Sequence, residues 1–492
     1  MACDLTGDAI SEPTCEPTSE PTSEPTSEPT SNLLRDLWRG AGADPAALVS
    51  VRFIETERSL PSSFRVGPVA AATIAAQALA AAQTWRARGG QPQAVEVSMR
   101  RALAMFRSER YLTIDGQPPQ DESSPIFGYH RSADARWVQI HTHFPHHHKG
   151  VLQLLGCADS RVAVAAAMAQ REAAELEASF AAAGLCAGVV RSAGEWQAHP
   201  QAIAIAALPL FEIERIGDAP PEPIGHAQPA LRPLQGVRVL DLSRVIAAPV
   251  AARTLAQHGA DVLAVGAAHL PNFESLVIDT GRGKRSARID LRDASGPARL
   301  GELVRRADVF LQAFRPGALA ARGFGAHALA ERRPGLIHVS LSAYGHTGPW
   351  AQRRGFDSLV QSASGIAFDE GEAAGLHLPG KLPCQALDHA TGYLAAFGAM
   401  VALQRRAIEG GSWQVRVSLA QTGHWLRSLG RDVNGLGAPD LTTEEIAPWR
   451  HAMPSAFGAI SAIAPVEQMA LTPAYFELPP ARPGTQAAEW LA

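Results

Sequence analysis

The feature that most constrains the fold is an internal repeat. Residues 64–99 and 383–419 each read as an Ala-rich helix, a basic last turn, a Gly-Gly pair and a strand of alternating character. The second copy has a carboxylate at its helix start, Asp388, where the first copy has Gly67 or Pro68, depending on a one-residue gap. Two copies of one unit, one of them without the carboxylate, predict a single working site per chain.

Composition narrows the class of protein. The 492 residues are 46% apolar and 19% charged, which is typical of a globular chain with room for two or three domains. The net charge is −4 and no basic tract occurs, so we expect no nucleic-acid partner. The five cysteines form no CxxC pair, which favours a reducing cytoplasm over a disulfide framework or a zinc site.

Neither a membrane span nor a signal peptide is expected. No run approaches the roughly 18 consecutive apolar residues that cross a bilayer. The N-terminus has acidic residues in place of a basic region followed by an apolar core. We therefore expect a cytoplasmic protein without a membrane partner.

Changes in composition divide the chain into five parts. Residues 1–31 carry a Ser-Glu-Pro-Thr repeat that has little apolar surface to bury, which predicts disorder. Residues 32–224 form a first ordered block, and the Pro-rich residues 225–233 form a linker. Residues 234–430 form a second block, and residues 431–492 are expected to be irregular.

The second block predicts a parallel sheet. Short β-type runs at 236–242, 260–265, 309–312 and 336–341 are separated by helical stretches of about a dozen residues. This alternation is typical of a doubly wound α/β fold, in which ligands bind at the carboxyl ends of the strands.

Seven segments of the second block, taken in order, resemble the class III CoA-transferase family. That family includes formyl-CoA and carnitine CoA-transferases and α-methylacyl-CoA racemase. Any one segment is a weak signal, whereas seven in the family's order are a specific one. The segments are Leu234–Val245, Gly259–Val262, Gly281–Ser286, Phe314–Leu319, Ser342–Trp350, Gly355–Asp357 and the helix that starts near Asp388.

The first block resembles the smaller C-terminal domain of the same family. The matching stretches are Asp134–His141, Glu172–Ala187 with the Gly188-Val-Val that follows, and His199-Pro-Gln. The order is therefore small part, linker, large part, as in a permuted or truncated tandem of the family unit. The resemblance implies an α/β fold: a large domain with a Rossmann-like, doubly wound parallel sheet, and a smaller α+β domain.

The resemblance also implies a reaction. Family members move CoA from an acyl-CoA to a carboxylic acid through an aspartyl anhydride and an aspartyl-CoA thioester, and the matching nucleophile here is Asp388. A carboxylate suits this role because each intermediate stays close in energy to a thioester. N–H groups at the helix N-terminus would face the developing oxyanion. Without the resemblance, Asp388 would read as a helix N-cap.

Five further residues match positions that hold CoA in the family. Val245 and Ala247 would contact the pantetheine and phosphate region, although this loop also reads as a plain strand-to-helix connection. Lys284 and Arg285, expected in a turn, would contact the CoA phosphates, or else be solvated surface charges. Phe314 would flank the adenine.

Other functions remain open at this stage. The racemase branch carries His at the middle of Gly355-Phe-Asp, and Phe356 cannot move a proton, which disfavours an acyl-CoA racemase or isomerase. Asp357 is interpreted as structural. A non-catalytic CoA-binding scaffold is the second alternative.

The remaining expectations concern metals and assembly. The histidines between 141 and 148 lack a nearby Cys or carboxylate, so no metal site is expected, and no cofactor beyond coenzyme A as a substrate. Family members form interlocked dimers. With pieces of two units in one chain, this protein is either a homodimer or a self-closed, pseudo-dimeric monomer.

Overall fold

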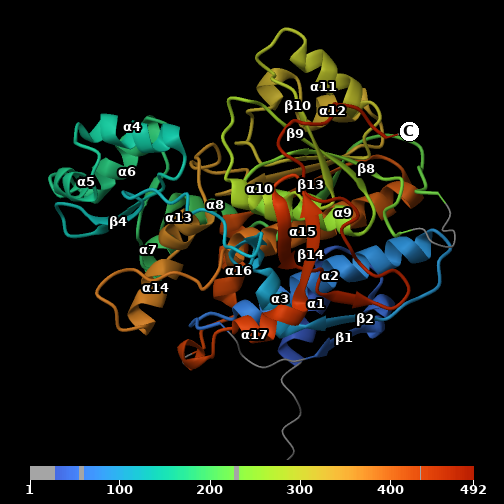
Figure 1. Cartoon of the computed structure of the whole chain (residues 1–492), viewed down its shortest axis with the longest axis horizontal. Coiled ribbons are helices and arrows are strands. Elements are labelled where there is room, and N and C mark those ends of the chain that lie inside the picture. Colours follow the sequence, from blue (N-terminus) through green and yellow to red (C-terminus); the bar gives the residue numbers. More distant parts are fainter. Residues whose placement is uncertain (1–27, 55–59, 226–231, 433, 492) are drawn as a thin grey trace, which may run out of the picture.

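A seven-stranded sheet forms the centre of the structure, a computed structural model that describes residues 28–54, 60–225, 232–432 and 434–491 (Figure 1). The strand order is β10-β9-β8-β11-β12-β13-β7, and all pairs are parallel except β13 with β7. The chain moves outward from β8 to β10, then returns to β11 beside β8. The bounds are β7 Phe211–Gly217, β8 Arg238–Leu242, β9 Asp261–Gly266, β10 Lys284–Arg288, β11 Val309–Gln312, β12 Ile337–Ser342 and β13 Ser412–Ser418.

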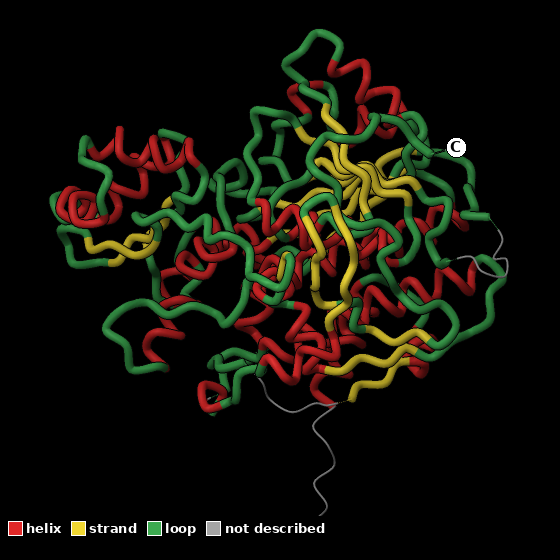
Figure 2. Tube along the Cα trace, viewed as in Figure 1, coloured by secondary structure: helices red, strands yellow, loops and turns green. Residues whose placement is uncertain are grey.

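Both faces of this sheet are covered by helices, as Figure 2 shows. Alternate residues of each strand point to opposite faces. Val239 and Leu311 belong to the core that contains α9 (Ala247–Gln257) and α15 (Ala386–Glu409), whereas Leu240 and Phe310 belong to the core that contains α11 and α12. This confirms the predicted doubly wound α/β fold. The bounds of α11 are Gly296–Val304 and those of α12 are Ala326–Arg332; three further helices of this part of the chain are α10 Glu274–Thr280, α13 Asp357–Ala363 and α14 Ile366–Ala373.

The two copies of the repeat have the same local structure. The first copy is α2 (Val66–Ala87), β2 (Val95–Ser98) and α3 (Met99–Met105), and the second is α15, β13 and α16 (Leu419–Ser428). At both junctions from strand to helix a serine caps the helix: the hydroxyl oxygen of Ser98 accepts a hydrogen bond from Arg101 N, and that of Ser418 accepts one from Gln421 N. The repeat in the sequence is thus a repeat in the fold.

The long helices of the two copies pack against each other. Gln404 Nε2 of α15 donates hydrogen bonds of 2.9 Å to Ala80 O and Thr84 Oγ1 of α2. Trp38, on α1 (Glu28–Gly40), stacks on Phe397 of α15 with ring centroids 5.7 Å apart. By length and composition α2 and α15 could each cross a membrane, but here they form the buried centre of the molecule.

The structure aligns the two helix starts without ambiguity. The residues before the helices, Arg65 and Gln385, have nearly equal backbone angles (φ −82°, ψ 57° and φ −76°, ψ 62°). Counting from them, Pro68 rather than Gly67 occupies the position of Asp388. The first copy therefore has no side chain able to act as an acid or a nucleophile at this position.

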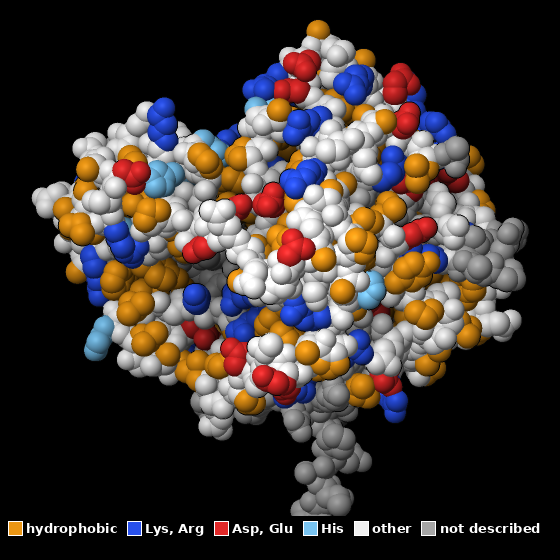
Figure 3. All heavy atoms as spheres, in the orientation of Figure 1, with side chains coloured by type: hydrophobic (Ala, Val, Ile, Leu, Met, Phe, Trp, Pro, Cys, Tyr) orange, Lys and Arg blue, Asp and Glu red, His pale blue; other side chains and the backbone are white. Residues whose placement is uncertain are grey.

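A small lobe projects from one side of the molecule (Figure 1). It pairs three antiparallel strands with helices around its own apolar core, which matches the predicted smaller α+β domain. Figure 3 shows the surface hollowed between this lobe and the main body, with side chains of both charges interspersed over this face. The bounds are β4 Gly128–Arg131, β5 Trp137–Ile140, β6 Ala187–Val189, α4 Pro145–Leu155, α5 Arg161–Met168 and α6 Ala173–Ala182; α7 Ala193–Gln197 and α8 Pro200–Ala206 lead back to the main body.

The expectation that residues 431–492 are irregular is wrong. They contain α17 (Thr443–Ile446), a hairpin and a further strand. The hairpin extends to β3 of the first block, and β16 pairs with β2 to complete the sheet β1-β2-β16, so the partners that order these residues are distant in sequence. The strands concerned are β1 Val51–Ile54, β3 Thr113–Ile114, β14 Arg450–Ser455, β15 Gly458–Ile463 and β16 Glu467–Met469.

Two expected boundaries also need correction. Helix α1 begins at Glu28, inside the stretch 1–31 that was expected to be disordered, while residues 1–27 lie outside the described residues. The first and second blocks are not structurally separate, because strand β7 of the first block forms the antiparallel edge of the large sheet. Most of the linker, residues 226–231, also lies outside the described residues.

Candidate active site

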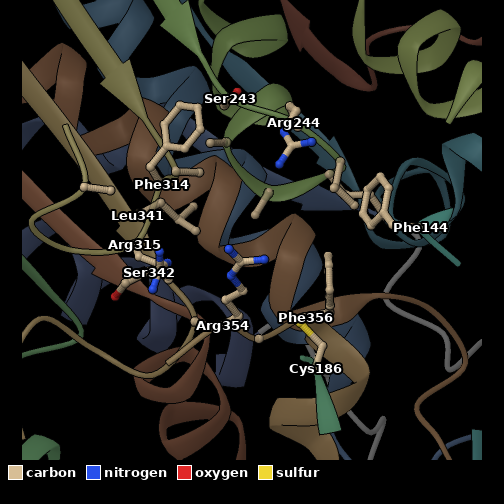
Figure 4. A pocket seen from close by; sticks show the side chains of 18 of the residues that line it. Phe144, Cys186, Ser243, Arg244, Phe314, Arg315, Leu341, Ser342, Arg354 and Phe356 are labelled. Atoms are coloured by element: carbon tan, nitrogen blue, oxygen red, sulfur yellow. The ribbon is translucent and has the colours of Figure 1, made fainter. Parts of the chain in front are cut away.

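A cavity of about 460 Å³ opens at the carboxyl ends of the central strands (Figure 4). Its walls include the segments that follow β8, β11 and β12, namely residues 243–248, 313–318 and 342–343, together with Asp388. Strands β8 and β11 are neighbours whose connections leave in opposite directions. Such a switch point is where doubly wound sheets bind ligands, because the loops on its two sides diverge and leave a crevice.

Glycine in α15 brings Asp388 to this cavity. Gly392 lies one turn after Asp388 on the same helix face. A side-chain carbon at Gly392 would collide with the carbonyl oxygen of Ala247 and would lie 3.0 Å from Val250. The missing side chain therefore lets α15 approach the first turn of α9 closely, and places Asp388 beside the loop that follows β8.

The carboxyl group of Asp388 is buried among acids. The residue is only 8% exposed, and its backbone N–H donates a 2.9 Å hydrogen bond to Oδ2 of Asp357. Burial, followed by the charges of Asp357 and Glu109, raises the pKa of Asp388 well above its usual range. Burial also raises the pKa of Asp357 to about 6. A carboxyl in such a site is poorly solvated when ionised, which makes it more reactive as a nucleophile than an exposed aspartate.

Asp357 holds the start of α15. Besides accepting from Asp388 N, it accepts a hydrogen bond from Gln361 Nε2, and Gln361 Oε1 in turn accepts one of 2.9 Å from Leu382 N. These contacts agree with a structural role for Asp357. They also mean that the Asp388 N–H is occupied, so this donor is not one of the helix N-terminal N–H groups that could face an oxyanion.

Three residues predicted to hold CoA line the same cavity as Asp388. They are Val245 and Ala247, at the start of α9, and Phe314, after β11. Val245 has a φ of 74°, which is unfavourable for a β-branched residue and turns the backbone sharply between β8 and α9. The turn brings the N-terminal end of α9, with its partial positive charge, to the cavity wall.

The structure places the two predicted phosphate-binding residues elsewhere. Lys284 and Arg285 lie in strand β10, not in a turn, and both are buried. Lys284 Nζ is 2.9 Å from Asp241 Oδ2, and Arg285 forms a bidentate ion pair with Asp261. They line a second cavity, of about 430 Å³, that shares residues 243–245 and Leu270 with the first. Their charges are already neutralised by carboxylates, which weakens the case for phosphate contacts.

Of the histidines between residues 141 and 148, His146 and His147 line the lobe side of the cavity. His141 stacks on Phe356 with ring centroids 3.8 Å apart. His147 Nε2 lies 3.7 Å from Cys186 Sγ, and burial lowers the pKa of His147 to about 4, so the ring is neutral at neutral pH. Among the described residues no group of three or more His, Cys, Asp or Glu side chains is arranged to hold a metal ion.

Four arginines that are not among the predicted site residues also line the cavity. They lie on strand-end loops of the cavity wall, and Figure 4 labels three of them. The sequence held two signals for them. One arginine follows the serine directly after β8 and another follows Phe314, and both lie inside segments that match the family. The other two form an Arg-Arg pair just before Gly355. The four are Arg244, Arg315, Arg353 and Arg354.

Comparison with known proteins decides the family. The profile described as CoA-transferase family III matches residues 48–209 and 234–429, which together make up most of the chain. The chain belongs to CoA-transferase family III. The match covers both blocks of the sequence, so the first block is a family segment as well as the second.

Individual relatives match over shorter spans. Acetyl-coenzyme A transferase nodX of Hypoxylon pulicicidum is 32% identical over 49% of this chain and 43% of its own length. Succinyl-CoA:glutarate CoA-transferase of Homo sapiens is 33% identical over 35% of this chain and 41% of its own length. This family III chain thus spans less than half the length of these two relatives. A solved CAIB/BAIF family protein from Brucella suis is 28% identical, covering 46% of this chain and 65% of that chain, with a TM-score of 0.37.

Proposed function

We propose that this protein is a CoA-transferase that moves CoA from an acyl-CoA to a carboxylic acid, with Asp388 as the nucleophile. The observation that carries the proposal is the position of Asp388: a buried carboxyl at the switch point of the sheet, in a cavity shared with Val245, Ala247 and Phe314. Family membership supports the same reaction class, since similar proteins are named acetyl-coenzyme A transferase and succinyl-CoA:glutarate CoA-transferase.

The proposed reaction proceeds in two exchanges. An oxygen of the ionised Asp388 attacks the thioester carbonyl, the C–S bond breaks, and CoA thiolate and a mixed anhydride result. The thiolate then attacks the Asp388 carbonyl carbon of the anhydride, releasing the first carboxylate and leaving an aspartyl-CoA thioester. The second carboxylate attacks that thioester and displaces the thiolate, which attacks the new acyl carbon and restores Asp388. No water or net proton is consumed.

The cavity supports this reaction better than racemisation. Proton exchange at the α-carbon needs an acid and a base on opposite sides of that carbon. Phe356, which occupies the racemase histidine position by resemblance, lines the cavity and stacks on His141, so its ring presents carbon to the site. A buried carboxyl facing a thioester is the group that the transferase reaction requires.

The test compares the intact protein with Asp388→Ala and Asp388→Asn. Each is incubated with an acyl-CoA and a panel of free carboxylic acids, and new acyl-CoA is followed by mass. We expect product with the unchanged chain and a loss of at least about 10³-fold in both variants, because a nucleophile is removed outright. Equal activity in the variants would exclude Asp388. CoA binding without any turnover would favour a binding scaffold.

A further inference from the structure

A short segment of the first block reaches the start of the helix that carries Asp388. It directly follows α3 and ends with the 3₁₀-helix η2 (Ser108–Arg110). Arg107 Nε and Arg110 Nη1 each donate a 2.8 Å hydrogen bond to Pro383 O, which lies just before α15. The block that lacks the aspartate therefore contacts the chain where the helix of the nucleophile begins.

One residue of this segment brings a negative charge close to Asp388. It is Glu109, whose Oε2 lies 3.2 Å from Nε2 of His389, the residue directly after Asp388. The His389 side chain is fully buried, and Phe106 stacks on its ring with centroids 5.3 Å apart. The contact between Glu109 and His389 is thus made inside the protein, where water screens charges weakly.

The charge of Glu109 is only partly compensated. Its Oε1 is buried and accepts no hydrogen bond from the described residues, and Arg110 Nε lies 3.8 Å from it. His389 adds a positive charge only when it is protonated. The charge of Glu109 also acts on Arg253 of α9, but that guanidinium already lies 2.7 Å from Asp279.

Asp388 is within reach of this charge. Burial raises the pKa of Asp388 most, followed by the charge of Asp357 and then that of Glu109. Glu109 and Asp388 share a set of charged or titratable neighbours. These are Asp357 on α13, Cys384 before α15, His389 on α15, Arg253 on α9 with Asp279 on α10, and Arg107 and Arg110 beside Glu109.

Acylation of Asp388 removes the charge that Glu109 repels. A nearby negative charge raises the free energy of the ionised carboxylate, but acts much less on an anhydride or a thioester, which is neutral at Asp388. In the transition state of the first attack, part of the charge has already passed to the substrate. The repulsion is therefore weaker in the transition state than in the free carboxylate, which favours the attack.

We propose that Glu109 is a positioning residue for the reaction: through His389 it holds the first turn of α15, and its charge favours the states in which Asp388 is acylated. This inference rests on the proposed CoA-transferase function. It gives the block without the aspartate a part in the chemistry of the other block, beyond support of the fold.

The experiment separates the charge of Glu109 from its contact. Glu109→Gln removes the charge but keeps an oxygen that can accept from His389 Nε2, whereas Glu109→Ala removes both. Glu302→Gln, at an exposed position of α11, is the matched control for the loss of one acidic charge. The kcat/KM for CoA transfer is measured against pH for the three variants and the unchanged chain, after thermal unfolding has shown that each variant is folded.

We expect the pH profiles of Glu109→Gln and the unchanged chain to cross. Below the midpoint of the rising limb Asp388 is mostly protonated, and it ionises more readily without Glu109, so kcat/KM should rise by about threefold. Above the midpoint the carboxylate is already ionised and better stabilised, so kcat/KM should fall by about threefold. Glu302→Gln should leave the profile unchanged.

Glu109→Ala should show the same crossing with a further loss at every pH, because the contact with His389 is lost as well. An equal loss at every pH in Glu109→Gln would overturn the inference and leave Glu109 with a role in the fold alone. A Glu109→Gln profile identical to that of the unchanged chain would exclude any role of its charge in the reaction.

Failure of the proposed function can be separated from failure of this inference. If the unchanged chain transfers no CoA at any pH, the function fails and the role of Glu109 in acylation fails with it. The coupling of the two carboxyl groups is measured without substrate, by urea unfolding at neutral pH. Asp388→Asn should stabilise the Glu109→Gln variant less than it stabilises the unchanged chain. Equal stabilisation in both would show that Glu109 does not act on Asp388.

Discussion

At the scale of single residues, the site is dominated by two aspartates from distant parts of the chain. Asp357 accepts the backbone N–H of Asp388, so the contact that fixes the helix start also brings two carboxyl groups together. Burial raises the pKa of both, and the charge of Asp357 raises that of Asp388 further. The protein therefore keeps a carboxyl at the cost of stability at neutral pH, which is expected of a group retained for its chemistry.

Replacing Asp388 should reveal that cost. The pKa of Asp388 lies well above the value of about 3.9 in an unfolded chain, so the native state binds the proton more tightly and stability falls as pH rises between these values. Asp388→Asn lacks this penalty. We expect it to be more stable than the unchanged chain at pH 7 by at least about 1 kcal/mol, and nearly equal to it below about pH 4, by urea unfolding. A difference that is independent of pH would contradict this reading.

The negative charge of Asp357 should set the pH range in which the protein is active. The nucleophile must be ionised, so kcat/KM should rise with pH as the carboxyl pair loses its protons. Asp357→Asn removes a neighbouring negative charge while its amide oxygen can still accept the Asp388 N–H. The pKa of Asp388 should fall, and the rising limb of the pH profile should move to lower pH. A limb that stays in place, or moves upward, would show that the two groups do not interact.

At the scale of secondary structure, close helix contact positions the nucleophile. A side chain at Gly392 would meet the backbone of α9, which cannot move aside as a flexible side chain can. Gly392→Ala should therefore destabilise the protein by about 1–3 kcal/mol and lower CoA transfer, measured by chemical unfolding and by kcat/KM. Gly423→Ala in α16 is the matched control, because the nearest atoms to its added carbon lie 3.6 Å away. Equal effects at both glycines would exclude the contact as the cause.

Local patterns predicted the elements well. The helix and strand of each repeat, the alternation of strands and helices in the second block and the place of Asp388 near a helix start were expected from periodicity, glycine pairs and matched segments. Lys284 and Arg285 were expected in a turn, but they lie in strand β10, and their side chains are paired with Asp241 of β8 and Asp261 of β9. Such pairing depends on sheet order, which local sequence does not contain.

The contacts that could not be predicted are those between distant segments. The strands of the C-terminal segment follow no clear alternating pattern, and β15 and β16 pair with strands more than 300 residues earlier in the chain. The place of Arg353 and Arg354 on the cavity wall was missed for the same reason: an Arg-Arg pair before a glycine gives no local sign that the fold will bring it to a cavity.

At the scale of the whole molecule, one buried carboxylate joins three distant segments. Glu467 of β16 accepts a 3.0 Å hydrogen bond from Gln77 of α2, and lies 3.3 Å from Nε2 of His258, directly after α9. Removing it would leave the buried amide nitrogen of Gln77 without its acceptor and take the negative charge away from His258. We expect Glu467→Ala to lower the free energy of unfolding by about 3–5 kcal/mol, and Glu444→Ala, an exposed change in the same segment, by less than about 0.5 kcal/mol. Similar values for both would contradict an integral C-terminal segment.

The packing of the two repeats within one chain predicts the assembly. Helices α2 and α15 bury each other inside a single chain, and β16 completes the sheet of the first copy. We propose that the protein is a self-closed monomer in which the copy that lacks the aspartate supports the working copy. Sedimentation should give the mass of one chain at micromolar concentrations. A stable dimer as the only species would contradict this assembly.

The central claim is that Asp388 forms covalent intermediates, and trapping them tests it most directly. The protein is incubated with succinyl-CoA in the presence of hydroxylamine, digested, and the peptide that contains Asp388 is examined by mass spectrometry. We expect an aspartyl hydroxamate on Asp388, formed from the anhydride or the CoA thioester and absent when the thioester is omitted. An unmodified Asp388 peptide during measurable CoA transfer would contradict it.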